Sequence, residues 1–233
     1  GLNSMSRQHP AISLIGVPTD VGAGHRGTSM GPEALRVAGL ADALRNRGLD
    51  VTDLGNLSGP ANPWTGPVDG YRHLAEVVEW NRAVMGAVEN ELMRSRLPIM
   101  LGGDHCLAIG SITAVARWCR RNERNLRVLW LDAHADFNTN QLTPTGNIHG
   151  MPVACLCGHG PDELVRLGGS QPAIGPEAVR QIGIRSVDRG EKRLVHEVGL
   201  DIYDMRFIDE AGIGAVMERV LDGVDERTHL HVS

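Results

Sequence analysis

The stretch Asp132-Ala133-His134-Ala135-Asp136 follows the mostly apolar run 126–131, and together they decide the fold that we expect. The apolar run is typical of a buried strand, and in an extended segment every second side chain points to the same side. Asp132, His134 and Asp136 therefore converge on one point. They do so where a core strand passes into a loop, which is where α/β proteins place their chemistry. The sequence predicts a metal site at the end of this strand.

Apolar strand-like runs alternate with helical patterns along the rest of the chain. Further strands are expected at residues 12–17, 50–54, 97–101, 180–184, 201–203 and from 228 to the last residue. Helices are expected at residues 32–47, 71–96, 107–121, 150–157, 190–198 and 213–221, with long loops at 55–70 and 137–149. This alternation predicts a three-layer α/β/α fold with a mostly parallel sheet that helices cover on both faces.

Composition narrows the class of protein. A chain of 233 residues with 42% hydrophobic and 3% aromatic residues suits a single domain, over residues 5–233, with an aliphatic core. The net charge of −5, with acids and bases interspersed, argues against nucleic acid as the main partner. No apolar run is long enough to suggest a transmembrane helix, so we expect no membrane partner.

Features at the N-terminus and among the cysteines point to the cytoplasm. Residues 1–4 resemble an expression scar before a native start at Met5, and nothing there has the layout of a signal peptide. Four cysteines in a chain of this length are too few for a disulfide framework, which favours a reducing cytoplasm. We expect them to be packing thiols, although Cys155 and Cys157 could be half of a zinc site.

A second polar motif follows a second strand. Gly102-Gly103-Asp104-His105 stands at the end of the strand at 97–101, where the glycines permit a tight turn. His105 can then face the same crevice as Asp132, His134 and Asp136. In isolation His105 would be read as a capping histidine. Two imidazoles with two carboxylates are a ligand set that suits Mn²⁺, Fe²⁺ or catalytic Zn²⁺.

These two motifs together resemble the arginase family of ureohydrolases, which carries a GGDH and a DAHxD motif. The segments 24–27 and 31–36 resemble the glycine-rich opening of that family, so the likeness runs from about residue 11 to the last residue. The resemblance implies an arginase-like fold and a site with two Mn²⁺ ions. It implies His105, Asp132, His134 and Asp136 as metal ligands, with Asp136 bridging the two ions.

The resemblance also implies a substrate. Asn138, Thr145 and Asn147 match the residues that hold the amino-acid end of L-arginine, with His134 beside the substrate. Thr145 follows Pro144, a mild departure that keeps the hydroxyl, and the asparagines could otherwise be turn formers. Asp188 and Glu191 match the acids that meet the α-ammonium group. Without the resemblance they would be read as a solvated acid pair at a helix start.

The implied reaction is hydrolysis of L-arginine to L-ornithine and urea by a metal-bridging hydroxide. Metal ions lower the pKa of a shared water, and Asp136 can accept a hydrogen bond from the resulting nucleophile. The leaving amine needs a proton, and a histidine titrates in the right range to supply it. His149 resembles the proton-shuttling histidine of the family, so we expect His149 and Asp136 to be the catalytic residues.

The pattern breaks at the end of the chain. A two-metal site needs about six protein ligands, and the family takes the rest from an S-x-D-x-D motif, whose first letter would be Ser233. Asp104 is expected to point away from the site, and Asp209 and Glu210 are expected to cap the start of a helix. We therefore expect a C-terminally incomplete domain that lacks its last strand and helices.

Several alternatives remain open. The protein could be a related ureohydrolase, such as an agmatinase or guanidinobutyrase, or a metal-poor non-catalytic fragment if the chain truly ends at Ser233. A metal deacetylase has a similar fold, but the GGDH histidine and the arrangement of Asn138 and His149 argue against it. The family resemblance implies a homotrimer or homohexamer.

Overall fold

The framework of the computed structural model, which describes residues 9–233, is a set of seven strands in that part of the chain. Every strand pair is parallel, as the alternating pattern predicts. In spatial order the first sheet contains β2 (Val51–Asn56), β1 (Ile12–Val17) and β3 (Leu97–Gly102). The second contains β6 (Asp201–Asp204), β5 (Val179–Ile184), β4 (Asn125–Leu131) and β7 (Thr228–Val232). The predicted scar at residues 1–4 and the start at Met5 lie outside the described residues.

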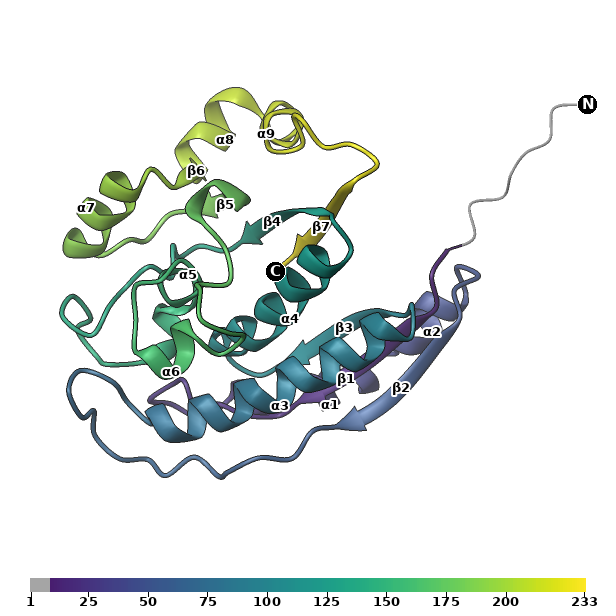
Figure 1. Cartoon of the computed structure of the whole chain (residues 1–233), viewed down its shortest axis with the longest axis horizontal. Helices are drawn as coiled ribbons and strands as arrows, with labels where there is room; N and C mark the ends of the chain where they lie inside the picture. The colour runs from purple at the N-terminus through teal and green to yellow at the C-terminus, as the bar shows by residue number, and fades with distance from the viewer. Residues whose placement is uncertain (1–8) are drawn as a thin grey trace, which may run out of the picture.

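Helices cover both faces of each sheet, which confirms the three-layer arrangement (Figure 1). On one side, α3 (Leu74–Met93) and α4 (Ala108–Arg121) bury a mainly aliphatic cluster against β1. On the other side lie α1 (Gly31–Val37) and α2 (Leu40–Arg45), and α8 (Met205–Ala211) and α9 (Ile213–Val220). The remaining α-helices are α5 (Pro152–Leu156), α6 (Asp162–Val165) and α7 (Arg189–Val198).

The two sheets do not join into one. β3 ends the first sheet and β7 ends the second, and both line a groove of about 460 Å³ that α3 and α4 also border. The exposed side chains of Leu230 and Val232 lie on β7 at this groove. The residues of each strand predict that the segment is a strand. They do not specify which neighbour it pairs with, and β3 and β7 do not pair with each other.

Two helical predictions need correction. The helix expected at residues 32–47 is two helices, because Gly39 adopts a left-handed conformation with φ of 83° between α1 and α2. The helix α8 was not expected, and it begins directly after β6. Asp204 caps it by accepting a hydrogen bond from the Phe207 N–H at 2.8 Å. Asp209 and Glu210 therefore lie near the end of α8, so the prediction that they cap a helix start is wrong.

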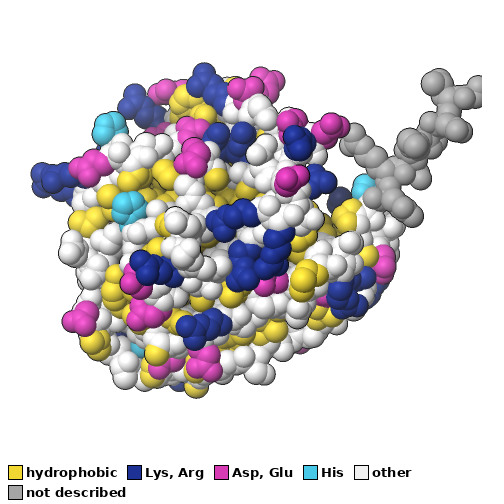
Figure 2. Space-filling view, viewed as in Figure 1, with side chains coloured by type: hydrophobic (Ala, Val, Ile, Leu, Met, Phe, Trp, Pro, Cys, Tyr) yellow, Lys and Arg dark blue, Asp and Glu magenta, His cyan; other side chains and the backbone are white. Residues whose placement is uncertain are grey.

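The surface carries both signs of charge. Over the face shown in Figure 2, basic and acidic side chains are interspersed, with apolar side chains visible between them. Among the described residues, no helix combines the length and the apolar character needed to cross a bilayer. All four cysteines are free; three are buried and Cys157 is partly buried, as expected of packing thiols.

Candidate active site

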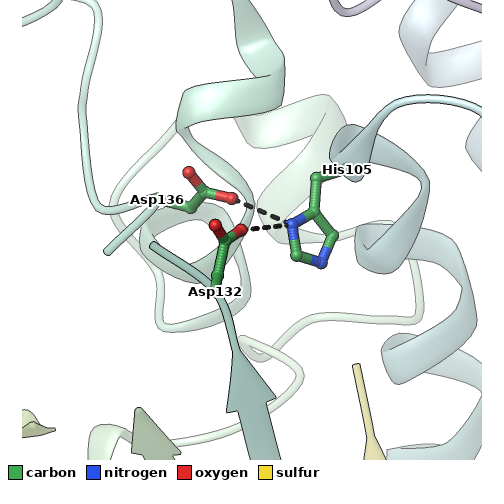
Figure 3. Close-up of side chains that lie close together, drawn as sticks. All are labelled: His105, Asp132 and Asp136. Carbon is green, nitrogen blue, oxygen red and sulfur yellow. Dashed lines mark hydrogen bonds and ion pairs between the residues drawn. The ribbon is translucent and has the colours of Figure 1, made fainter. Parts of the chain in front are cut away.

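Three of the four predicted ligands meet at the carboxyl ends of β3 and β4 (Figure 3). His105 Nδ1 lies 2.8 Å from Asp132 Oδ2 and 3.2 Å from Asp136 Oδ2. One ligand atom from each of the three residues lies within 4.8 Å of the others. One nitrogen and two carboxylate oxygens in this arrangement could hold a single divalent cation.

The turn after β3 aims His105 at the carboxylates. Gly103 has φ of 57°, and a Cβ there would lie 2.5 Å from the Val17 carbonyl oxygen, so only glycine fits. Asp104 points the other way, as expected, because its oxygens accept hydrogen bonds from the N–H groups of Gly22 and Cys106 at 2.8 and 2.9 Å. The His105 ring stacks on Trp130 with centroids 4.1 Å apart, which fixes its plane.

The two carboxylates differ in protonation behaviour although they share one imidazole. Burial opposes charge on His105, but its hydrogen bonds to Asp132 and Asp136 raise its pKa to about 9. Burial also opposes charge on Asp132, yet hydrogen bonds from His105 and from the His134 N–H lower its pKa to about 2. For Asp136 burial dominates and raises the pKa to about 6. A protonated His105 thus holds two carboxylates together where a cation could replace its proton.

His134 lies beside this cluster and not within it. Its Nδ1 is 3.2 Å from Asp132 Oδ1, and its side chain is 62% exposed. Its backbone pairs with Ser186 after β5 as an isolated parallel bridge. Of the four residues that were predicted to converge, His105, Asp132 and Asp136 do so, whereas the His134 ring is turned toward solvent.

One cavity of about 270 Å³ brings the predicted residues together. It is lined by all ten site residues that the sequence predicted, namely His105, Asp132, His134, Asp136, Asn138, Thr145, Asn147, His149, Asp188 and Glu191. Sequence reasoning missed Thr143, Pro144, Gly150 and Ser186, which also line it. Ser186 could have been found, because it follows β5 as Asp132 follows β4. Larger hollows exist, such as one of about 840 Å³ between α7 and β6, but they lack this donor set.

The substrate-side residues form a hydrogen-bonded network. Asn138 Nδ2 donates to Asp188 Oδ2 at 2.9 Å, and the Asp188 side chain remains accessible. Glu191 is 4% exposed and accepts hydrogen bonds from the N–H groups of Phe137 and Asp188 at 2.9 and 3.0 Å. Both acids were expected to contact the substrate. Asp188 is accessible to a ligand, whereas Glu191 is buried and both of its oxygens already accept backbone hydrogen bonds.

Local hydrogen bonds shape the loop before His149. Thr143 Oγ1 accepts hydrogen bonds from the N–H groups of Thr145 and Gly146, and Thr145 Oγ1 accepts one from Asn147 N–H. Among the described residues, Asn138 Oδ1 and Asn147 Oδ1 are buried without a hydrogen-bond donor. Because buried acceptors are normally satisfied, these two oxygens are suited to a ligand that carries N–H groups.

His149 lies in the short helical turn Ile148–Gly150 and lines the same cavity. Its backbone N–H donates to the Gly22 carbonyl at 3.0 Å, which ties this turn to the glycine-rich opening loop. Burial lowers the pKa of the His149 side chain, so the imidazole is neutral at neutral pH. A neutral imidazole can accept a proton and pass it on.

Known proteins resemble this chain along nearly its whole length. The family model described as "Arginase family" matches residues 10–233. The arginase of Bacillus caldovelox is 43% identical over 225 residues, which cover 95% of this chain and 74% of the relative. The arginase of Brevibacillus brevis is 38% identical over 223 residues, again 95% of this chain and 74% of the relative.

Solved structures agree. The native structure of Bacillus caldovelox arginase at pH 5.6 superposes with a TM-score of 0.88 at 41% identity, covering 96% of this chain and 75% of that one. The formimidoylglutamase of Bacillus subtilis, at 22% identity and a TM-score of 0.68, shares the fold. The match of the family model to almost every described residue, together with these relatives, shows that the chain belongs to the arginase family and is a hydrolase.

Proposed function

We propose that the protein hydrolyses the guanidinium group of L-arginine to give L-ornithine and urea, with Mn²⁺ as its cofactor. One observation carries the proposal: the ten predicted residues line a single cavity in a chain of the arginase family. The related ureohydrolases, agmatinase and guanidinobutyrase, are the alternative within the family.

The donor set fits a hard or borderline divalent cation. The ligand atoms are carboxylate oxygens from Asp132 and Asp136 and an imidazole nitrogen from His105, a set that suits Mn²⁺. Structural zinc prefers cysteine ligands, and this cluster contains none. When bound, the metal supplies Lewis acidity and a nucleophile derived from water at neutral pH. The family resemblance implies two ions, and a second ion would need ligands beyond these three residues, of which His134 is the candidate that lines this cavity.

The chain's own residues provide the proton transfers. Hydrolysis adds a water across a carbon–nitrogen bond, so a proton must leave the attacking water and one must reach the leaving amine. Asp136, buried and itself part of the donor cluster, would accept the hydrogen bond of the attacking water. His149, neutral and lining the same cavity, carries a proton to the amine.

Other residues select the amino-acid end of the substrate. The accessible carboxylate of Asp188 is a partner for the α-ammonium, and the unpaired Asn138 Oδ1 and Asn147 Oδ1 can accept its N–H groups. Hydroxyl and amide donors of Thr145 and Asn147 are available for the α-carboxylate. This head-group recognition favours arginine over agmatine, which lacks the carboxylate.

The proposal is tested by urea release from L-arginine, agmatine and 4-guanidinobutyrate after incubation of the protein with Mn²⁺. We expect the highest kcat/KM with L-arginine. A higher kcat/KM with agmatine or 4-guanidinobutyrate would show that this compound, and not arginine, is the preferred substrate. No urea from any of the three, with no Mn²⁺ bound, would favour a metal-poor non-catalytic protein, which the outward-turned His134 also suits.

Metal binding has its own test. Asp132→Ala removes a carboxylate that contacts both His105 and His134, so we expect Mn²⁺ affinity to fall by more than the roughly 10- to 100-fold typical of outer-shell changes. Isothermal titration calorimetry measures this against Asp209→Ala, which removes an acid in α8, away from the cavity. Equal affinities of the two variants would exclude Asp132 as a ligand.

Two further expectations rest on the family resemblance. We infer that the protein works in the cytoplasm as a homotrimer or homohexamer. Light scattering of the purified protein would test the oligomeric state, and a monomer would contradict it.

A further inference from the structure

Glu191 ties two loops of the active site together. It lies in the first turn of α7 and is 4% exposed. Its Oε2 accepts from the N–H of Phe137, 54 residues earlier in the chain, and its Oε1 accepts from the N–H of Asp188. One carboxylate thus connects the residue after Asp136 to the start of α7.

We propose that Glu191 is a positioning residue, which fixes Asp136 relative to Asp188, and is not a ligand of the substrate ammonium. This inference rests on the proposed function for the identity of the substrate. It replaces the role that the family resemblance implies for Glu191.

The peptide group between Asp136 and Phe137 is held at both ends. Its carbonyl accepts hydrogen bonds from the N–H groups of Val153 and Ala154 at 3.0 and 3.3 Å, and its N–H donates to Glu191 at 2.9 Å. Asp136 needs this support, because its φ of 49° is a left-handed conformation that residues other than glycine seldom adopt. The orientation of this peptide group determines where the Asp136 carboxylate points, and that carboxylate lies 3.2 Å from His105.

The two acids at the start of α7, Asp188 just before the helix and Glu191 in its first turn, therefore have different tasks. The Asp188 carboxylate is accessible and is joined to the cavity by the hydrogen bond from Asn138 at 2.9 Å. The Glu191 carboxylate is buried, and each of its oxygens is already used by a backbone N–H. Glu191 acts on the reaction through Asp136 and Asp188.

A pair of ligands separates positioning from recognition. L-Arginine carries the α-ammonium group, and 5-guanidinopentanoate is the same molecule without it. Glu191→Gln keeps the size of the side chain but leaves one oxygen acceptor for two N–H donors. We expect kcat/KM to fall by about tenfold for both compounds, the equivalent of one net hydrogen bond, with their ratio unchanged.

Two controls frame this result. Glu197→Gln makes the same change on the exposed side of α7 and is expected to alter neither kcat/KM nor the ratio. Asp188→Asn is expected to collapse the ratio, because it weakens the partner of the ammonium. A collapse of the ratio in Glu191→Gln would overturn the inference, since Glu191 would then recognise the ammonium itself.

A measurement without turnover tests the same inference. In native-state hydrogen exchange of the Mn²⁺-loaded protein, the amides of Phe137 and Asp188 should exchange slowly, and Glu191→Gln should accelerate at least one of them about tenfold or more. Fast exchange of both amides in the unsubstituted protein, or no change in the variant, would refute the connection. If the unsubstituted protein released no urea from arginine, the proposed function would fail while this exchange experiment still decided the role of Glu191.

Discussion

Neighbouring residues of one strand end acquire opposite acid–base properties. Asp132 and Asp136 both contact His105, but Asp132 also accepts the His134 N–H, and its pKa falls to about 2. Asp136 is more deeply buried and its pKa rises to about 6. The carboxylate that holds its charge most firmly and the carboxyl group whose pKa lies nearer neutrality are therefore only four residues apart in the sequence.

The role of His149 gives a prediction at the residue scale. His149→Asn removes the imidazole that we propose as the proton carrier but keeps a polar side chain, and His149 is outside the donor cluster. We expect kcat to fall by about 10²-fold or more, the range of general acid–base catalysis, with Mn²⁺ affinity unchanged. Urea production and calorimetry measure the two effects. His196→Asn on α7 is the matched control, and a full-rate His149→Asn enzyme would remove His149 from the mechanism.

At the scale of elements, a glycine sets how closely α1 packs on β3. A Cβ at Gly31 would clash with the carbonyl oxygen of Gly102, the last residue of β3 and the residue before the turn that aims His105. The clash would involve a Cβ and a backbone carbonyl oxygen, so it cannot be relieved by a change of side-chain rotamer.

Gly31→Ala is therefore expected to lower the free energy of unfolding by about 1–3 kcal/mol. Gly214→Ala is the matched substitution near the start of α9, where a Cβ would meet nothing within 4 Å. There we expect a gain of up to about 1 kcal/mol from helix propensity. Urea denaturation of both variants measures the difference. Equal effects at the two positions would contradict the close approach of α1 to β3.

At the scale of the whole molecule, contacts between helices connect the two sheets, which share no strand pairing. β3 and β7 leave a groove between the two sheets, and beside it α3 packs against the first sheet and α4 against the second (Figure 1). Asn81 of α3, fully buried, accepts a hydrogen bond from the Gly110 N–H of α4 at 2.7 Å, and Arg117 and Glu89 pair between the same helices at 2.8 Å. This helix pair holds the ends of β3 and β4 together, and with them the donor cluster.

The groove predicts a pH dependence of stability. His231 of β7 lines it, and burial together with the neighbouring His229 lowers the pKa of His231 to about 4. The unfolded chain, with a histidine pKa of about 6.5, binds this proton first as the pH falls. The contribution of His231 to stability is complete above pH 6.5 and declines between about 6.5 and 4.

His231→Leu should remove that part of the dependence, by up to about 1.4 kcal/mol per pH unit within the window. The free energy of unfolding at several pH values, compared with His196→Leu on the exposed face of α7, measures it. Because the raised pKa of Asp136 acts with the opposite sign, only the difference between variants is diagnostic. Parallel curves for His231→Leu and the unsubstituted protein would contradict the burial of this imidazole.

The sequence alone determined where the strands lie and which side chains stand at their ends. Alternation and apolar runs locate the strands because side-chain direction repeats locally, and the two motifs after residues 97–101 and 126–131 place His105, Asp132 and Asp136 at one edge. Only the tertiary structure decided what those side chains touch. The backbone bonds that occupy Glu191 and the separation of β3 from β7 depend on partners distant in the chain, and no local pattern encodes a distant partner. The break at Gly39 and the outward turn of His134 are local conformations that the helix and strand patterns do not specify.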